Sequence, residues 1–127
     1  MNVVNLLELL DVFPLLFLGI TTVFSLCVGS FLNVVAYRLP IMLVQEYESE
    51  YRDLKGLKPI STPVFNLAKP DSRCPCCEEK IKWWQNIPVV SYIFLLGKCQ
   101  SCDVSISKRY PIVELATGVI GCLIAIS

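Results

Sequence analysis

The sequence predicts a mainly α-helical membrane protein with a transmembrane helix, a cytoplasmic zinc-ribbon-like loop domain, and the start of a second transmembrane helix. Three observations predict this architecture. Apolar residues make up 54% of the chain and the mean hydropathy is +0.60, which is typical of integral membrane proteins. Two apolar runs lie near the ends of the chain, and all of the positive charge lies between them. Two Cys-x-x-Cys units occupy the same middle region.

A chain of 127 residues has room for one small domain and one or two membrane spans. We expect an N-terminal segment with the first span in residues 1–37, the cytoplasmic domain in 38–110, and a truncated second span in 111–127. The net charge is zero, so nothing in the bulk electrostatics supports binding to nucleic acid. The chain has no histidine, which excludes Ser-His and Cys-His catalysis and histidine-ligated metal sites within it.

The first apolar run, Val12 to Tyr37, has 26 residues without a formal charge. As a helix it measures roughly 39 Å, enough to cross a hydrocarbon core of about 30 Å with some tilt. A cleaved signal peptide is the competing interpretation, but the run is too long and no basic segment precedes it. Small and polar residues recur on one face of this helix: Thr22, Ser25, Gly29, Asn33 and Tyr37. We interpret that face as a helix-packing surface, with direct substrate contact as the alternative.

The positive charge predicts an orientation. All eleven lysines and arginines fall between Arg38 and Arg109, whereas the leading segment carries only Glu8 and Asp11. By the positive-inside rule, the middle region is cytoplasmic and the N-terminus lies on the opposite side of the membrane. A cytoplasmic loop is kept reduced, which favours metal-bound thiolates over disulfides.

Several local patterns follow the first span. Val44, Tyr47, Tyr51 and Leu54 share one face, which predicts a short amphipathic helix packed on the domain or lying at the membrane surface. Gly56 is a plausible end for it, and Leu57–Pro70 reads as a loop. Pro88–Leu96 is too short to span and predicts a strand or helix, in the zinc domain or against the interface. Aromatic side chains suit either a headgroup belt or the domain core: Trp83, Trp84, Tyr92 and Tyr110.

The second apolar run begins at Pro111 and reaches Ser127. Between Leu115 and Ile126 it has only twelve residues, fewer than the roughly 20 that a span requires. We therefore expect this sequence to be the front part of a longer protein, or a second copy to cover that end. Glu114 is expected near the cytoplasmic end of this helix.

The cysteine spacing predicts a metal site. Each Cys-x-x-Cys unit can place two thiolates on one turn, and the 21 residues between the units suit a two-knuckle zinc site. Four thiolates leave no open position, so the predicted zinc is structural and stabilises a domain with a small core. The predicted ligands are Cys74, Cys77, Cys99 and Cys102. Two disulfides or a redox dithiol pair are the alternatives. Cys76 is expected to be a free thiol, and Cys27 and Cys122 packing residues or, conceivably, acylation sites.

Three blocks of sequence, taken in order, carry a resemblance. The first is Gly29-Ser30-Phe31-Leu32-Asn33-Val34 with Arg38-Leu39-Pro40. The second is Ser72-Arg73-Cys74-Pro75-x-Cys77, which leads into Ile81–Trp84 and Asn86–Ser91. The third is Gly97-Lys98-Cys99-x-x-Cys102, which is followed by Ile106–Pro111 and Val113–Gly118. Together they resemble the N-terminal part of bacterial type IV prepilin peptidases, which are also N-methyltransferases.

The resemblance implies a multi-pass enzyme of the bacterial inner membrane. Such enzymes cleave the basic leader from type IV prepilins and type II secretion pseudopilins at the cytoplasmic face. They then methylate the new N-terminal residue with S-adenosylmethionine. The family's zinc-binding cysteines correspond to the four predicted ligands. In the family, the position that Asp103 occupies here is often glycine.

Family proteolysis depends on two aspartates in later segments, one of them in a Gly-Asp motif. The aspartates of this chain match neither position: Asp11, Asp53, Asp71 and Asp103. We interpret them as solvated structural residues and expect no leader cleavage by this chain alone. The leading hypothesis is thus the zinc-binding N-terminal portion of a prepilin peptidase. A non-catalytic zinc-stabilised module that binds a pilin or secretion partner is the alternative, and a small membrane-anchored redox protein is the third.

Overall fold

A computed structural model describes Glu8 and residues 13–127 of the chain. The element order is α2 (Pro14–Leu54), the 3-10 helix η1 (Trp83–Asn86), α3 (Val90–Phe94) and α4 (Arg109–Ile126). Asp11 and Val12 lie outside the described residues. The predicted mainly helical architecture is confirmed, and Pro88–Leu96 forms a short helix rather than a strand.

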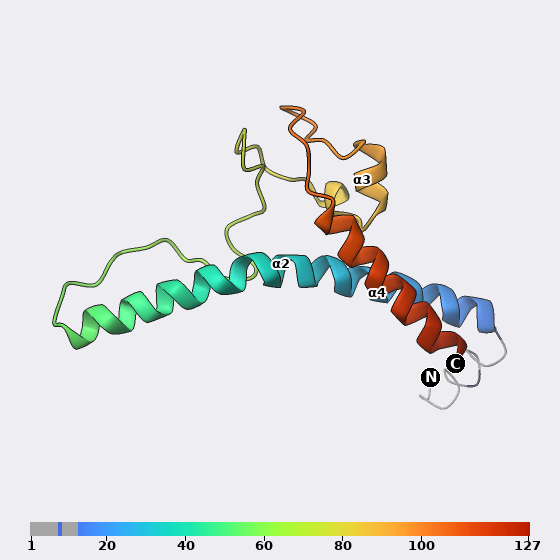
Figure 1. Ribbon diagram of the computed structural model, residues 1–127, viewed down its shortest axis with the longest axis horizontal. Coiled ribbons are helices and arrows are strands. Elements are labelled where there is room, and N and C mark those ends of the chain that lie inside the picture. The colour runs from blue at the N-terminus through green and yellow to red at the C-terminus, as the bar shows by residue number, and fades with distance from the viewer. Residues whose placement is uncertain (1–7, 9–12) are drawn as a thin grey trace.

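Helix α2 has 41 residues and continues through Pro40. The prediction of a separate amphipathic helix after Pro40 was therefore wrong, and so was its packing on the domain. Residues 41–54 extend the first helix as an arm, on which Tyr47 and Tyr51 are 67% and 58% exposed. Proline removes a single backbone bond, while the strong helix formers on either side of it maintain the helix. Figure 1 shows the two halves of α2 sloping away from each other.

The arm ends where the sequence predicted. Gly56 has φ of +64°, a left-handed conformation that glycine adopts without steric cost. The N–H of Leu57 donates to the carbonyl of Arg52 at 2.9 Å, and the N–H of Gly56 donates to that of Asp53 at 3.1 Å. These two bonds form a Schellman motif that satisfies the last carbonyls of the helix. Residues 57–70 then run as a loop without helix or strand, as expected.

Helix α4 packs antiparallel against the N-terminal half of α2 (Figure 1). Small residues allow the close approach: a Cβ added at Gly29 would meet the side chain of Thr117 and lie 2.8 Å from the Cα of Glu114. On α4, a Cβ at Gly121 would meet the side chain of Ser25. Farther along, the side-chain amide of Asn33 donates to the backbone carbonyl of Tyr110 at 3.1 Å.

The contacts of Ser25, Gly29 and Asn33 support the packing interpretation of the polar stripe, because all three face α4. Tyr37, the last member of the stripe, is 64% exposed and does not share this role. Close approach through small residues is the usual basis of helix association in membranes.

Both long helices are apolar enough to cross a membrane by length and composition. Their most apolar 18-residue windows have mean hydropathies of 2.2 in α2 and 1.5 in α4. Only 6% of the α2 window and 22% of the α4 window are buried inside the structure. A core helix of a soluble protein would be mostly buried, so the exposed apolar surface indicates a membrane-associated helical protein.

Candidate metal centre

The first cysteine pair lies on a tight turn that we call the first knuckle, residues 73–80. The N–H of Glu78 donates to the carbonyl of Cys74, and the N–H of Cys74 donates to that of Glu79, both at 3.0 Å. Arg73 and Lys80 form an antiparallel bridge that closes the turn. The bonds fix the backbone so that both sulfur atoms of Cys74 and Cys77 can point the same way.

The second knuckle, residues 98–105, repeats this structure. The N–H of Asp103 donates to the carbonyl of Cys99 at 3.1 Å, and the N–H of Cys99 donates to that of Val104 at 2.9 Å. Lys98 and Ser105 form the matching bridge. Two segments far apart in sequence therefore present equivalent cysteine pairs to one another.

Each knuckle turns through a left-handed residue just after its second cysteine. Glu78 has φ of +57° and Asp103 has φ of +55°. An L-residue pays roughly 1–2 kcal/mol for this conformation. The left-handed backbone thus explains why glycine suits the position of Asp103, and glycine would suit the position of Glu78 for the same reason.

The structure brings together the sulfur atoms of the four predicted ligands. All four lie within 4.8 Å of one another, with Cys74 Sγ 3.7 Å from Cys102 Sγ and Cys77 Sγ 3.9 Å from Cys99 Sγ. A tetrahedral zinc with Zn–S bonds of about 2.3 Å requires S–S separations of about 3.8 Å. The donor set and its spacing therefore fit zinc. Cys76 is exposed and stands outside the cluster.

The thiol pKa values of the clustered cysteines are shifted in opposite directions. Backbone N–H groups of Cys77 and Cys76 stabilise the Cys74 thiolate and lower its pKa to about 6. At Cys102 the N–H of Val104 acts in the same direction, but burial and the neighbouring sulfurs outweigh it and raise the pKa to about 12. Burial and the Cys74 sulfur likewise raise the pKa of Cys77, against the N–H of Glu79. One sulfur is thus prepared as a thiolate, and others must lose protons when metal binds.

Arg38 attaches the loop before the first knuckle to α2. It is 7% exposed, and its guanidinium donates to the carbonyls of Asn66 at 2.8 Å and Pro70 at 2.6 Å. The same group lies 5.7 Å from the centre of the Phe65 ring. The partners are backbone carbonyls 28 and 32 positions away, so no sequence pattern could have identified them.

Glu114 attaches the segment between the knuckles to α4. Its side chain is buried and accepts a hydrogen bond from the backbone N–H of Val89 at 2.7 Å. Val89 has φ of +59°, which is a strained value for a β-branched residue. Gln85 in η1 links that segment to the second knuckle, since its amide donates to the side chain of Gln100 at 2.9 Å. We call residues 71–106, held by these contacts, the cysteine module.

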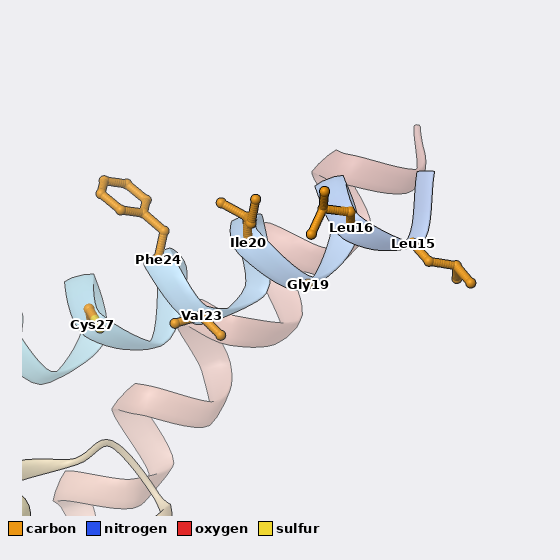
Figure 2. A pocket seen from close by; sticks show the side chains of 7 residues that line it. All are labelled: Leu15, Leu16, Gly19, Ile20, Val23, Phe24 and Cys27. Carbon is orange, nitrogen blue, oxygen red and sulfur yellow. The ribbon is translucent and has the colours of Figure 1, made fainter. Parts of the chain in front are cut away.

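The remaining predicted residues lie apart from the cluster. The carboxylate of Asp71 pairs with Lys80 at 2.7 Å, and this hydrogen bond lowers the pKa of Asp71. Asp53 and Asp103 are exposed. An open apolar hollow of about 550 Å³ lies on α2. Figure 2 shows the residues that line it: Leu15, Leu16, Gly19, Ile20, Val23, Phe24 and Cys27. That lining suits apolar chains, and it includes none of the four clustered cysteines.

Residues 23–127 match the family described as the bacterial peptidase A24 N-terminal domain. The chain belongs to this family. A protein of Pseudomonas aeruginosa named prepilin leader peptidase/N-methyltransferase is 47% identical over 121 residues, which cover 94% of this chain and 42% of that protein. Proteins with the same name from Neisseria gonorrhoeae and Aeromonas hydrophila are 50% identical over 109 residues and 43% identical over 127 residues.

The match covers 84% of this chain and 38% of the Neisseria protein, and 96% of this chain and 43% of the Aeromonas protein. The chain therefore spans about two fifths of the length of these A24 relatives. The resemblance to the prepilin peptidases, limited to their N-terminal part, is confirmed. No solved structure matches the chain.

Proposed function

We propose that this chain is the N-terminal, zinc-binding portion of a prepilin leader peptidase/N-methyltransferase of the bacterial inner membrane. The observation that carries the proposal is the convergence of four sulfur atoms within 4.8 Å in a chain of the A24 N-terminal family. The named relatives support the family activity.

In this proposal a structural zinc is held by Cys74, Cys77, Cys99 and Cys102. When bound, the ion joins the two knuckles with a closed shell and supplies folding free energy to a module that has little core of its own. Within residues 71–106, Cys74 is the only buried apolar side chain, at 6% exposure. The module therefore depends on ligation, on Arg38 and on Glu114 rather than on hydrophobic packing.

The proposed placement has α2 and α4 crossing the membrane, the N-terminus in the periplasm and the cysteine module in the cytoplasm. Arg38 follows the uncharged part of α2, and Lys108 and Arg109 precede the apolar part of α4. Positive charge at the same end of two antiparallel helices supports this orientation. The reducing cytoplasm then keeps the sulfurs available to metal.

The whole enzyme would cleave the leader from prepilins or pseudopilins and methylate the new N-terminus with S-adenosylmethionine. We place the two proteolytic aspartates outside these 127 residues. The role proposed for this portion is to position the cytoplasmic module beside the membrane, where the leader of a membrane-inserted substrate is cut.

Metal analysis of the purified chain tests the zinc site. We expect about one zinc per chain, protection of four thiols from alkylation, and loss of protease resistance in residues 71–106 after chelation. Cys76→Ser is the matched control, because it removes an exposed thiol outside the cluster and should leave the zinc content unchanged. A metal-free preparation whose module stays protease-resistant would contradict the site, and a reversible dithiol would favour the redox alternative.

A cleavage assay tests the division of the enzyme. The chain in detergent, mixed with a prepilin, should release no leader, while a protein extended to the full length of its relatives should release it. Cleavage by the chain alone would overturn our placement of the aspartates. Failure of the extended protein, combined with co-purification of a pilin, would favour the non-catalytic binding module.

A further inference from the structure

The short helix α3 presents an apolar surface that nothing in the described part of the chain covers. Val90, Ile93 and Phe94 follow the helical i, i+3, i+4 spacing and are 45%, 64% and 80% exposed. Leu96, just after the helix, is 83% exposed. We call these four side chains the α3 patch. Large apolar side chains gathered in this way are unfavourable in water, which indicates that something covers them.

The attachment of α3 to α4 fixes its depth. Val89, immediately before α3, donates its N–H to Glu114 at 2.7 Å, and Glu114 lies five residues into α4 from Arg109. At 1.5 Å per residue, the backbone of Glu114 is about 7.5 Å farther along the helix axis than Arg109, and the start of α3 lies within reach of the Glu114 side chain at that level. Figure 1 likewise shows α3 beside the first turns of α4. If Lys108 and Arg109 lie at the headgroups, α3 lies at the level of the upper acyl chains.

The charges around the patch suit an anionic lipid surface. Between the two cysteine pairs, residues 80–98 carry Lys80, Lys82 and Lys98 and no acidic residue, while Glu78, Glu79 and Asp103 lie on the knuckles at either side. Lys108 and Arg109 add two cations at the start of α4. Cytoplasmic leaflets carry anionic lipids that attract basic residues near the surface by about 1 kcal/mol each. The arm of α2, by contrast, carries Glu46, Glu48, Glu50 and Asp53 and lacks this complementarity.

We propose that the α3 patch inserts into the headgroup–acyl boundary of the cytoplasmic leaflet, so that the cysteine module lies on the bilayer. Interfacial helices bury their apolar face by roughly 5–10 Å, which matches the depth set by the Val89–Glu114 bond. The occupant of the patch is thus lipid rather than a second protein surface. The inference rests on the proposed membrane placement of α2 and α4, and it is independent of the enzymatic activity.

Fluorescence quenching in vesicles tests the insertion. The full 127-residue chain, with Trp83→Phe and Trp84→Phe, receives one tryptophan at a time and is reconstituted in phosphatidylcholine–phosphatidylglycerol vesicles. The lipids carry bromine at a shallow or a deep acyl position. The test variant is Phe94→Trp, and Ile93→Trp replaces it if helicity or zinc content is lost. Tyr47→Trp on the exposed arm is the aqueous control, and Phe24→Trp on α2 is the deep control.

We expect shallow bromolipids to quench Phe94→Trp roughly twofold or more above Tyr47→Trp, with little quenching by aqueous acrylamide. Quenching equal to that of Tyr47→Trp would overturn the proposal. Protection of Phe94→Trp from both bromine and acrylamide would also overturn it, because a protein surface would then cover the patch. If deep bromolipids do not quench Phe24→Trp, the proposed membrane placement of α2 is wrong. If they quench Phe24→Trp but shallow bromolipids do not quench Phe94→Trp, only the insertion of the α3 patch is wrong.

Discussion

Gly29 offers a direct test of the packing between α2 and α4. We predict that Gly29→Ala weakens the helix pair, because the added Cβ would meet the side chain of Thr117 and lie 2.8 Å from the Cα of Glu114. A backbone atom at that distance cannot rotate away, so the two helices must separate. The shift would also strain the bond from Asn33 to Tyr110.

Gly19→Ala is the matched control. Gly19 lies on the same helix with nothing within 4 Å of its added Cβ. Both substitutions gain the same helix propensity, about 1 kcal/mol, so the difference between them isolates the contact. Overpacking of a close contact costs about 1–3 kcal/mol. The unfolding equilibria of the two variants should therefore differ by a factor of roughly 5–150.

The assay is reversible unfolding by sodium dodecyl sulfate in mixed micelles, followed by helicity and tryptophan emission. We expect the midpoint for Gly29→Ala to fall below that for Gly19→Ala, and the midpoint for Gly19→Ala to equal or exceed the wild-type value. Equal shifts for the two variants would refute the reasoning, since the contact with α4 would then contribute nothing measurable.

Three further predictions concern the cysteine module and the loop that precedes it. Arg38→Ala should increase the rate of proteolysis within residues 57–70, because hydrogen bonds to a charged group contribute about 1.5–3 kcal/mol. Arg38→Lys should restore only part of the protection, since one ammonium group cannot reproduce the two-pronged bonding of the guanidinium to both carbonyls. Glu78→Gly and Asp103→Gly should each stabilise their knuckle by about 0.5–1 kcal/mol, seen as slower zinc loss to a chelator; faster loss would contradict the strain argument. Zinc affinity should fall as the pH decreases from about 8 to 5, because the Cys102 thiol must release a proton to bind zinc throughout this range. The fall should be steeper below about pH 6, because Cys74 also takes up a proton below its pKa of about 6. A competition titration with a chromophoric chelator measures this, and a flat profile would count against thiolate ligation.

The sequence was sufficient to predict the features that depend on local chemistry. The spacing of Cys74, Cys77, Cys99 and Cys102 predicted the cluster, because a two-residue separation constrains each turn on its own. Gly56 marked the end of α2 for the same reason: a left-handed residue is required at one defined position after a helix.

Features that depend on tertiary context could not be predicted. The sequence predicted a short amphipathic helix of its own after the first span, whereas helix propensity outweighs the one bond that Pro40 removes and α2 continues to Leu54. The partners of Arg38 and Glu114 are backbone groups, which carry no residue-type signal. Gly118 and Gly121 did provide a signal that was missed: small residues on α4 at three-residue spacing match the small residues already noted on α2.

The unbroken course of α2 has a mechanical consequence. From Arg38 to Leu54 the helix extends 17 residues, or about 25 Å, past its uncharged half. Because the helix continues through the bend at Pro40, a change of about 10° in the inclination of the inner half swings the tip at Leu54 by about 4 Å if the bend angle is kept. The helix would thus act as a lever: small tilts of its inner half, where α4 packs, become larger displacements at the tip of the arm.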